Sequence, residues 1–285
     1  MTRILTDSAC DLRAADAGLL NVILVPLNVT LEDGTVLRDG LDIDGDDYYD
    51  HMKQCDKLPT TSQPSPELYA AAFAEAKAAG DETVVIHLSG GLSGTGQAAR
   101  IGADLAEYED VVFVDSMNAT MGEGALVLLA AQLRDEGKNA AQIAAVLEKA
   151  KNHLHVVAFV DDLKYLHKGG RLPGAVAVAG GMLGIKPLIQ VKDGKVGLAG
   201  TGRGAAGAFN ALYRKVEALG PIDSSLPTVA LYTDDIQDAE TICDEMVAAH
   251  GIARPRIAQV GSVIGTHAGP GAAGFVFFDA NPDAE

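Results

Sequence analysis

Apolar and polar positions along the first half of the chain follow the pattern of strands separated by helices. Short apolar runs rich in β-branched residues predict strands at residues 4–5, 83–88 and 111–114. Helical periodicity predicts helices at residues 66–79, 97–107, 122–134 and 140–151. Ser65 and Pro66 are expected as N-cap and first residue of the first of these helices. Apolar strands separated by helices are typical of a parallel sheet covered on both faces.

A second unit is predicted from about residue 156. Its main elements are strands at 156–160, 228–232, 257–260 and 275–278 and helices at 204–219 and 238–250. A short helix follows the first of these strands, and a run of small apolar residues comes next, at 174–185. Asp193-Gly194 joins two further strands, 188–192 and 195–199, as the type I′ turn of a hairpin. We therefore expect two α/β domains, an N-terminal parallel-sheet domain at 1–155 and a C-terminal mixed-sheet domain at 156–285.

Composition and charge narrow the class of protein. Of the 285 residues, 48% are hydrophobic and 21% charged, which is typical of a globular chain. The net charge of −17 argues against binding to nucleic acid and against stable anchoring on anionic membranes, because both would repel the chain. Three cysteines without metal-ligand spacing indicate a reducing compartment. No signal-peptide pattern follows Met1, and the longest apolar run is too short to span a bilayer, so we expect a soluble cytoplasmic protein.

Polar and glycine residues follow the predicted strands, at 6–8, 89–95 and 115–118. In open α/β sheets, ligands bind beyond the carboxyl ends of the strands. The segment 89–95 opens a helix, and its hydroxyls and backbone N–H groups suit a carboxylate or phosphate. It matches neither the P-loop nor the dinucleotide-binding fingerprint. Ser93, Gly94 and Thr95 are therefore candidate ligand-binding residues, and a plain capping turn is the alternative.

Two more segments contribute candidate residues of the same kind. Thr61 and Ser62 belong to a hydroxyl cluster that lies too far before the helix at 66–79 to cap it, which leaves them available for binding. His267 stands in a glycine-rich segment, 261–271, which predicts a loop shaped around a ligand. An ordinary turn with an incidental histidine is the alternative for this segment.

Basic residues are few, and three of them are candidates for anion recognition. Lys168 and Arg171 lie in a cluster at 164–171 that is equally typical of a helix C-terminus. Arg203 stands just beyond the hairpin and before a helix. The planar guanidinium of an arginine suits carboxylate or phosphate binding.

Taken together, the motifs resemble the DegV family of fatty-acid-binding proteins, the acyl-carrier subunits of bacterial fatty acid kinase systems. The matching segments, in family order, are 6–8 with 11–12, 61–65, 92–95 with Gln97, 115–116, 165–166 with 168–171, 186–187, and 265–267 with 269–271. The resemblance therefore covers nearly the whole chain. Gly96 stands where an aromatic residue is common and Asn118 where serine is frequent. The first departure predicts a reshaped pocket and leaves the acyl preference open.

The resemblance implies that a long-chain fatty acid is enclosed between the two domains, with its carboxylate at the interface. Thr61 and Ser93 would donate hydrogen bonds to the carboxylate, with Ser62, Gly94, Thr95 and His267 nearby. Arg203, Lys168 and Arg171 would contact the headgroup or a separate ATP-dependent kinase, which forms an acyl phosphate on the bound ligand. Residues 175–184 would line the acyl tunnel, unless they form an ordinary buried helix. No cofactor, metal or catalytic residue of its own is expected.

Two other functions stay open at this point. One is a kinase subunit that binds a small carbonyl compound through His267, as in relatives of dihydroxyacetone kinase. The other is a serine hydrolase using Ser93 and His267, although residues 91–95 lack the final glycine of the nucleophile elbow. The sequence leaves open the length and unsaturation of the acyl chain and the oligomeric state.

Overall fold

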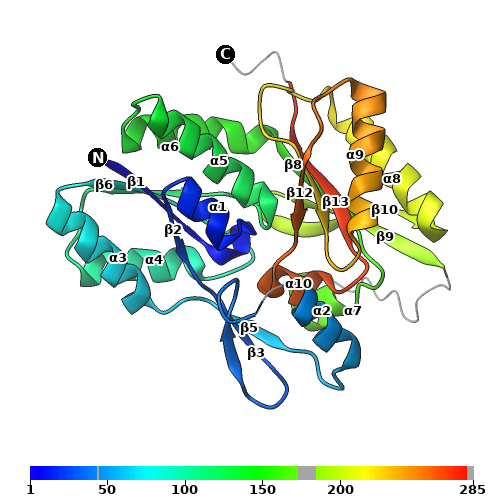
Figure 1. Cartoon of the computed structure of the whole chain (residues 1–285), viewed down its shortest axis with the longest axis horizontal. Coiled ribbons are helices and arrows are strands. Elements are labelled where there is room, and N and C mark those ends of the chain that lie inside the picture. Colours follow the sequence, from blue (N-terminus) through cyan, green and yellow to red (C-terminus); the bar gives the residue numbers. More distant parts are fainter. Residues whose placement is uncertain (44, 173–183, 281–285) are drawn as a thin grey trace.

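The computed structural model describes residues 1–43, 45–172 and 184–280. The described residues form three sheets, which lie side by side in Figure 1. A four-stranded sheet has the order β2-β1-β6-β7, and a six-stranded sheet has the order β10-β9-β8-β13-β11-β12. A three-stranded sheet, β4-β3-β5, lies at the lower edge of the view. The predicted class, a parallel α/β unit joined to a mixed-sheet α/β unit, is confirmed.

The four-stranded sheet is parallel throughout, as its apolar strands predict. Its strands are β1 (Thr2–Asp7), β2 (Val22–Val25), β6 (Glu82–His87) and β7 (Val111–Asp115). One face packs against α3 (Pro66–Ala79) and α4 (Thr95–Leu105), through a core that includes Tyr69, Phe73 and Ala99. The other face packs against α1 (Ala14–Leu19), α5 (Met121–Asp135) and α6 (Ala140–Ala150). Both faces are therefore buried, which explains why the strands read as continuous apolar runs.

The six-stranded sheet is mixed. Its strands are β8 (Leu154–Phe159), β9 (Ile185–Lys192), β10 (Lys195–Arg203), β11 (Val229–Tyr232), β12 (Arg256–Gln259) and β13 (Ala273–Phe278). Only the β11–β12 pair among these neighbours is parallel. The predicted hairpin joins β9 to β10, and Asp193 and Gly194 both have positive φ, 51° and 72°, as a type I′ turn requires. The helices α8 (Gly204–Leu219) and α9 (Ile236–His250) cover one face of this sheet (Figure 1).

Several short elements carry no sequence signal that we recognised. They are α1, β2, η1 (Ser8–Cys10), β3 (Asn28–Thr30), β4 (Val36–Arg38), α2 (Gly45–Gln54), β5 (Thr60–Ser62), η2 (Lys151–His153) and α10 (Ser262–Ala268). The short helix predicted in the second unit corresponds to α7 (Lys164–Lys168). Strands of three residues are too short to show a period of two. The hydroxyl cluster thus begins with the strand β5, and most of the glycine-rich segment 261–271, predicted as a loop, is the helix α10.

The predicted start of α3 is confirmed, with Ser65 as the N-cap residue and Pro66 as the first residue of the helix. The Ser65 side chain caps no N–H group of the helix; it bonds the Glu67 carboxylate, whose pKa is lowered by its own backbone N–H and by this bond. One local prediction was wrong. Arg203 is not beyond the hairpin but is the last residue of β10, paired with Ile185.

Other predictions are not tested by the described residues. Most of the apolar run at 174–185 lies outside them. The domain division at 155/156 stays a prediction, because one hydrophobic cluster joins Leu126 on α5 to Val156 and Val276 on the six-stranded sheet. Within the described ranges, every helix is too short or too polar to cross a bilayer.

Candidate functional site

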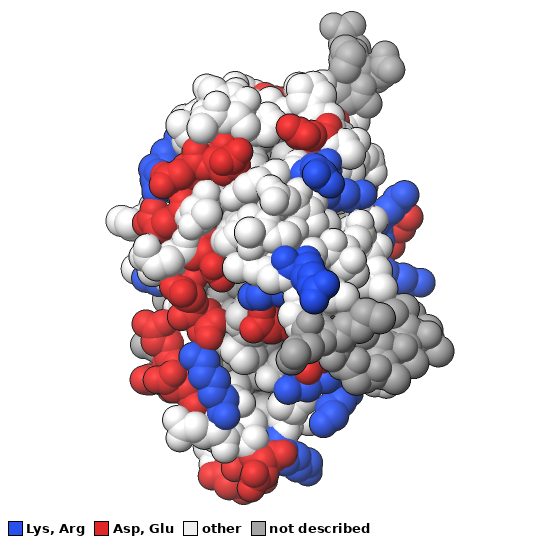
Figure 2. Space-filling view, turned by 90° about the vertical axis from the view of Figure 1, so that its right-hand side faces the viewer, with Lys and Arg blue, Asp and Glu red and all other residues white. Residues whose placement is uncertain are grey.

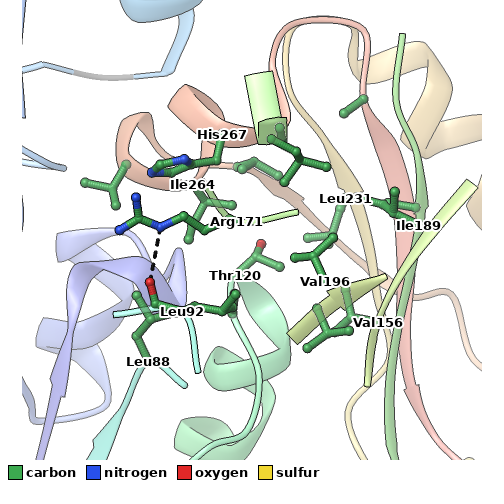
Figure 3. Close-up of a pocket in the computed structure, with 18 of the residues that line it drawn as sticks. Leu88, Leu92, Thr120, Val156, Arg171, Ile189, Val196, Leu231, Ile264 and His267 are labelled. Atoms are coloured by element: carbon green, nitrogen blue, oxygen red, sulfur yellow. Dashed lines mark hydrogen bonds between the residues drawn. The ribbon is translucent and has the colours of Figure 1, made fainter. Parts of the chain in front are cut away.

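A deep cavity lies between the six-stranded sheet, α10 and the carboxyl ends of the parallel strands (Figure 3). It encloses about 950 Å³ of space between atoms, counting the part that opens to solvent. The cavity therefore occupies the position at which open α/β sheets bind ligands.

One end of the cavity is apolar, because the strands of the mixed sheet alternate between two cores. On β8, Val157 and Phe159 point toward α8 and α9, whereas Val156 and Ala158 point into the cavity. The same alternation supplies most of this wall from the neighbouring strands: Ile189, Val191, Val196, Leu231 and Gly274. Ala273, whose side chain belongs to the core under α8 and α9, also borders the cavity. A Cβ at Gly274 would lie 2.6 Å from both the Cβ of Ala158 and the Val157 carbonyl oxygen, so only glycine fits there without a shift of β8. This end suits a hydrocarbon chain.

The other end of the cavity is polar and is built from four separate segments. Thr61, Ser62 and Gln63 come from β5 and the residue after it, and Ser93 comes from the loop after β6. Arg171 follows α7, and His267 projects from α10 toward it in Figure 3. These side chains present hydroxyl, amide, imidazole and guanidinium groups, which can all donate hydrogen bonds to an anion.

His267 and Thr61 form the central contact of the polar end. The Nε2 atom of His267 lies 2.9 Å from Oγ1 of Thr61. Burial, together with the positive charge of Arg171, lowers the pKa of His267 to about 4, so the imidazole is neutral at pH 7. Its Nδ1 atom is buried without a partner, packed against Gly169, where a Cβ would lie 2.1 Å away. We assign the proton to Nε2, because the unpaired Nδ1 atom is then an acceptor, which costs less to bury than an unpaired N–H donor. With Nε2 as the donor to Thr61, the Thr61 hydroxyl is free to donate its own proton into the cavity.

Ser93 is held by the start of α4. Its Oγ lies 2.8 Å from Oγ1 of Thr95, and the Thr95 backbone N–H donates to it at 3.3 Å. The Ser93 hydroxyl bonds Thr95, and the His267 imidazole bonds Thr61. Among the described residues, these two side chains do not bond each other. The serine–histidine bond that activates a nucleophilic serine is therefore not formed, which disfavours the hydrolase alternative.

Arg171 joins the two sides of the cavity mouth. Its Nε donates to the Leu92 carbonyl at 3.2 Å, drawn as the dashed line in Figure 3, and its Nη1 donates to the Gly169 carbonyl at 2.6 Å. Lys168, which is exposed, lines an adjoining hollow together with Thr61, Arg171 and His267. The hollow shares Thr61, Arg171 and His267 with the polar end of the cavity.

Arg203 is exposed at the end of β10 and is not among the described residues that line the cavity. Figure 2 looks onto the face that carries α8 and α9, where acidic side chains gather toward one side and basic side chains toward the other. The hairpin β9–β10 carries four of the basic residues, Lys186, Lys192, Lys195 and Arg203. The roles predicted for Arg203 in headgroup or partner contact stay predictions.

Of the predicted site residues, the structure brings Thr61, Ser62, Ser93, Arg171 and His267 together around one cavity. Gly94 and Thr95 lie behind its lining, with Gly94 against the Gln63 side chain and Thr95 fully buried.

Gly96 is not among the described residues that line the cavity, and its predicted effect on the shape of the cavity stays a prediction. It lies inside α4 against His87, where a Cβ would meet the imidazole at 2.4 Å. Sequence reasoning missed Gln63, Thr120 and most of the apolar wall, although the period-two alternation in the mixed-sheet strands was a usable signal.

Comparisons with known proteins agree with this architecture. The family model described as an uncharacterised protein of the DegV family matches residues 1–280. A DegV domain-containing protein of Caldanaerobacter subterraneus is 32% identical over 97% of this chain and 98% of its own length. A solved DegV family protein of Thermus thermophilus, described as fatty acid binding, is 32% identical, with a TM-score of 0.88 over 98% of this chain and 99% of that one. A stearic acid-binding protein of Eubacterium ventriosum is 26% identical, with a TM-score of 0.88 over 98% of both chains.

Fold and cavity together define an α/β protein with a cavity that is apolar at one end and polar at the other. The chain belongs to the DegV family.

Proposed function

We propose that this protein binds one long-chain fatty acid, with the acyl chain along the mixed sheet and the carboxylate at the Thr61–His267 end. The observation that carries the proposal is the cavity itself, which has an apolar wall and a cluster of donors at one end only. The fatty acid binding described for the related Thermus thermophilus and Eubacterium ventriosum proteins supports it. A small carbonyl ligand would leave most of the apolar wall uncovered, which disfavours that alternative.

The acyl chain supplies most of the binding free energy. Each methylene removed from water contributes about 0.8 kcal/mol, so ten of them contribute roughly 8 kcal/mol, which corresponds to micromolar affinity before the costs of association. The headgroup contacts then set the orientation of the ligand. A buried carboxylate needs several donors, and Thr61, Ser93 and the guanidinium of Arg171 supply them.

We further propose that the bound carboxylate is the substrate of a separate ATP-dependent kinase. A carboxylate oxygen attacks the γ-phosphorus of ATP, the bond from that phosphorus to the β,γ-bridging oxygen breaks, ADP leaves, and an acyl phosphate stays on this protein. The hollow lined by Lys168, Arg171 and His267 gives the carboxylate an opening toward a partner. Cations beside it suit the charge that develops on the transferred group. In this reading the protein presents a substrate and contributes no nucleotide site or catalytic residue.

A cytoplasmic location and the lack of a cofactor belong to the same proposal. The three cysteines are unpaired, and within the described residues no three His, Cys, Asp or Glu side chains are placed to hold a metal ion.

Native mass spectrometry and analysis of extracted lipid test the binding proposal. We expect up to one fatty acid per chain, and delipidated protein should take up an added C16 or C18 acid but not a C4 acid. Protein that carries no lipid and takes up no added long-chain acid would refute the proposal. Uptake of a small carbonyl compound in its place would support the dihydroxyacetone-kinase-like alternative.

A further inference from the structure

The helix α10 holds the headgroup site together, yet its own sequence gives its N-terminus no capping side chain. It projects Val263, Ile264 and His267 into the cavity. Its N-cap residue is Gly261, which has no side chain, so the first N–H groups of the helix depend on partners elsewhere. Two carboxylates that are distant in sequence accept these bonds. The Gly261 N–H donates to Asp11 at 3.0 Å, and the Ser262 N–H donates to Asp39 at 2.9 Å.

Asp39 is the more completely held of the two. Only 3% of it is exposed, and the Ser262 hydroxyl donates to the same carboxylate oxygen at 2.6 Å. The Ser8 hydroxyl and the Val263 N–H also bond this carboxylate. A buried carboxylate with this many donors is fixed in one position.

The same small sheet holds Asp39 and Thr61, which contact opposite ends of α10. Asp39 directly follows β4, and its N–H donates to the Leu27 carbonyl just before β3 at 3.0 Å. Thr61 lies in β5, and β3 lies between β4 and β5 in the sheet. The two outer strands are therefore about 9.5 Å apart. Ser262 and His267 are separated by about 7.5 Å of helix rise. The sheet thus spans the helix, with one outer strand at each end.

A third element supports the helix from another side. On α2, the hydroxyl of Tyr48 lies 2.5 Å from Oγ1 of Thr266, and the hydroxyl of Tyr49 donates to the Val260 carbonyl at 2.8 Å. These contacts keep α10 folded and packed when the bonds at its first residues are weakened. A change at Asp39 is therefore expected to shift the helix and not to unfold it.

We propose that Asp39 is a positioning residue for the headgroup site: it ties the first turn of α10 to β4 and so sets where His267 meets Thr61 on β5. The proposal rests on the proposed function, because the Thr61–His267 pair is then the part of the site that orients the ligand carboxylate. Asp11 also holds the first turn of α10 in place, because its carboxylate accepts hydrogen bonds from the Gly261 N–H and from the Thr120 hydroxyl at the start of α5.

The first test needs no ligand. In the ligand-free protein, NMR titration should give the His267 imidazole a pKa of about 4. Asp39→Asn preserves the shape of the side chain but loses acceptors, so His267 should move out of its buried position and its pKa should rise toward 6.5. The matched control is Asp42→Asn, whose carboxylate accepts hydrogen bonds from the backbone and side chain of Arg38 at the surface. The control should titrate like the wild type.

The second test separates positioning from general stability. Affinities are measured for a fatty acid and for the fatty alcohol of the same chain length. Asp39→Asn should weaken binding of the acid about tenfold, as expected for one lost hydrogen bond to a charged group, and leave the alcohol nearly unchanged. An unchanged His267 titration, or equal losses for acid and alcohol, would overturn the proposal.

Two further outcomes are decisive as well. If Asp39→Asn does not fold, Ser262→Ala takes its place, because it removes the hydroxyl bond to Asp39 and keeps the backbone bond. This variant should raise the pKa of His267 by a smaller amount. An unchanged pKa would overturn the proposal. A wild type that binds neither acid nor alcohol would refute the proposed function, while the titration would still decide the role of Asp39.

Discussion

Filling the apolar end of the cavity tests directly where the acyl chain lies. Ala158 stands on β8, half-buried, with its side chain on the cavity wall. Ala158→Leu adds three carbon atoms there, which displace about three methylenes of a ligand that extends along this strand. At about 0.8 kcal/mol per methylene, a chain that fills the wild-type cavity should lose ~2.4 kcal/mol, or roughly fiftyfold in affinity. A chain about three carbons shorter should bind the variant as well as it binds the wild type.

Calorimetric titration with saturated acids of increasing length measures this effect, and the length of highest affinity should shift downward by about three carbons. Ala71→Leu, an exposed position on α3, is the control for the added side chain. Thermal denaturation of both variants shows whether the larger side chain strains the core, because overpacking also destabilises. Equal affinity losses at all chain lengths, or no loss at any, would show that the acyl chain does not pass β8.

The remaining predictions concern the polar end. Thr61→Val and Ser93→Ala should each weaken fatty acid binding by roughly 1–3 kcal/mol in titrations, whereas ester hydrolysis that disappears in Ser93→Ala would favour the hydrolase. Because the pKa of His267 is lowered from 6.5 to about 4 in the folded protein, its contribution to stability is present above pH 6.5 and is lost as the pH falls toward 4. In chemical denaturation, the free energy of unfolding of the wild type should therefore fall by up to ~3 kcal/mol relative to that of His267→Gln between pH 6.5 and 4. A difference between the two free energies that does not change with pH would contradict the lowered pKa of His267. Lys168→Ala and Arg203→Ala should lower kinase-dependent acyl phosphate formation without releasing fatty acid. Recovery of the rate at saturating kinase in single-turnover assays would indicate that the residue docks the kinase. A loss of bound fatty acid in proportion to the loss of acyl phosphate would leave Lys168 and Arg203 only a role in binding.

The regular elements were predictable because their side-chain patterns are local. The strands β6 and β7 are continuous apolar runs, and their long flanking helices repeat every three to four residues. The turn Asp193-Gly194 requires two positive φ angles, and few other dipeptides adopt them so readily. The same local reading picked out Thr61, Ser93 and His267, because polar residues next to strand ends and glycines stand out in an apolar pattern.

Only the tertiary structure decided which of these segments come into contact. The contact between Thr61 and His267 joins residues 206 positions apart, and it depends on a three-residue strand and a seven-residue helix that carry no periodic signal. The apolar wall combines side chains from five strands, each of which reads in sequence as ordinary core. Asp39 resembles a surface residue of an acidic chain until the fold buries it against the first turn of α10. The sequence alone determined the elements and the chemical groups available for a site, because secondary structure follows local patterns; only packing between distant segments decided which groups form the cavity and hold its headgroup end.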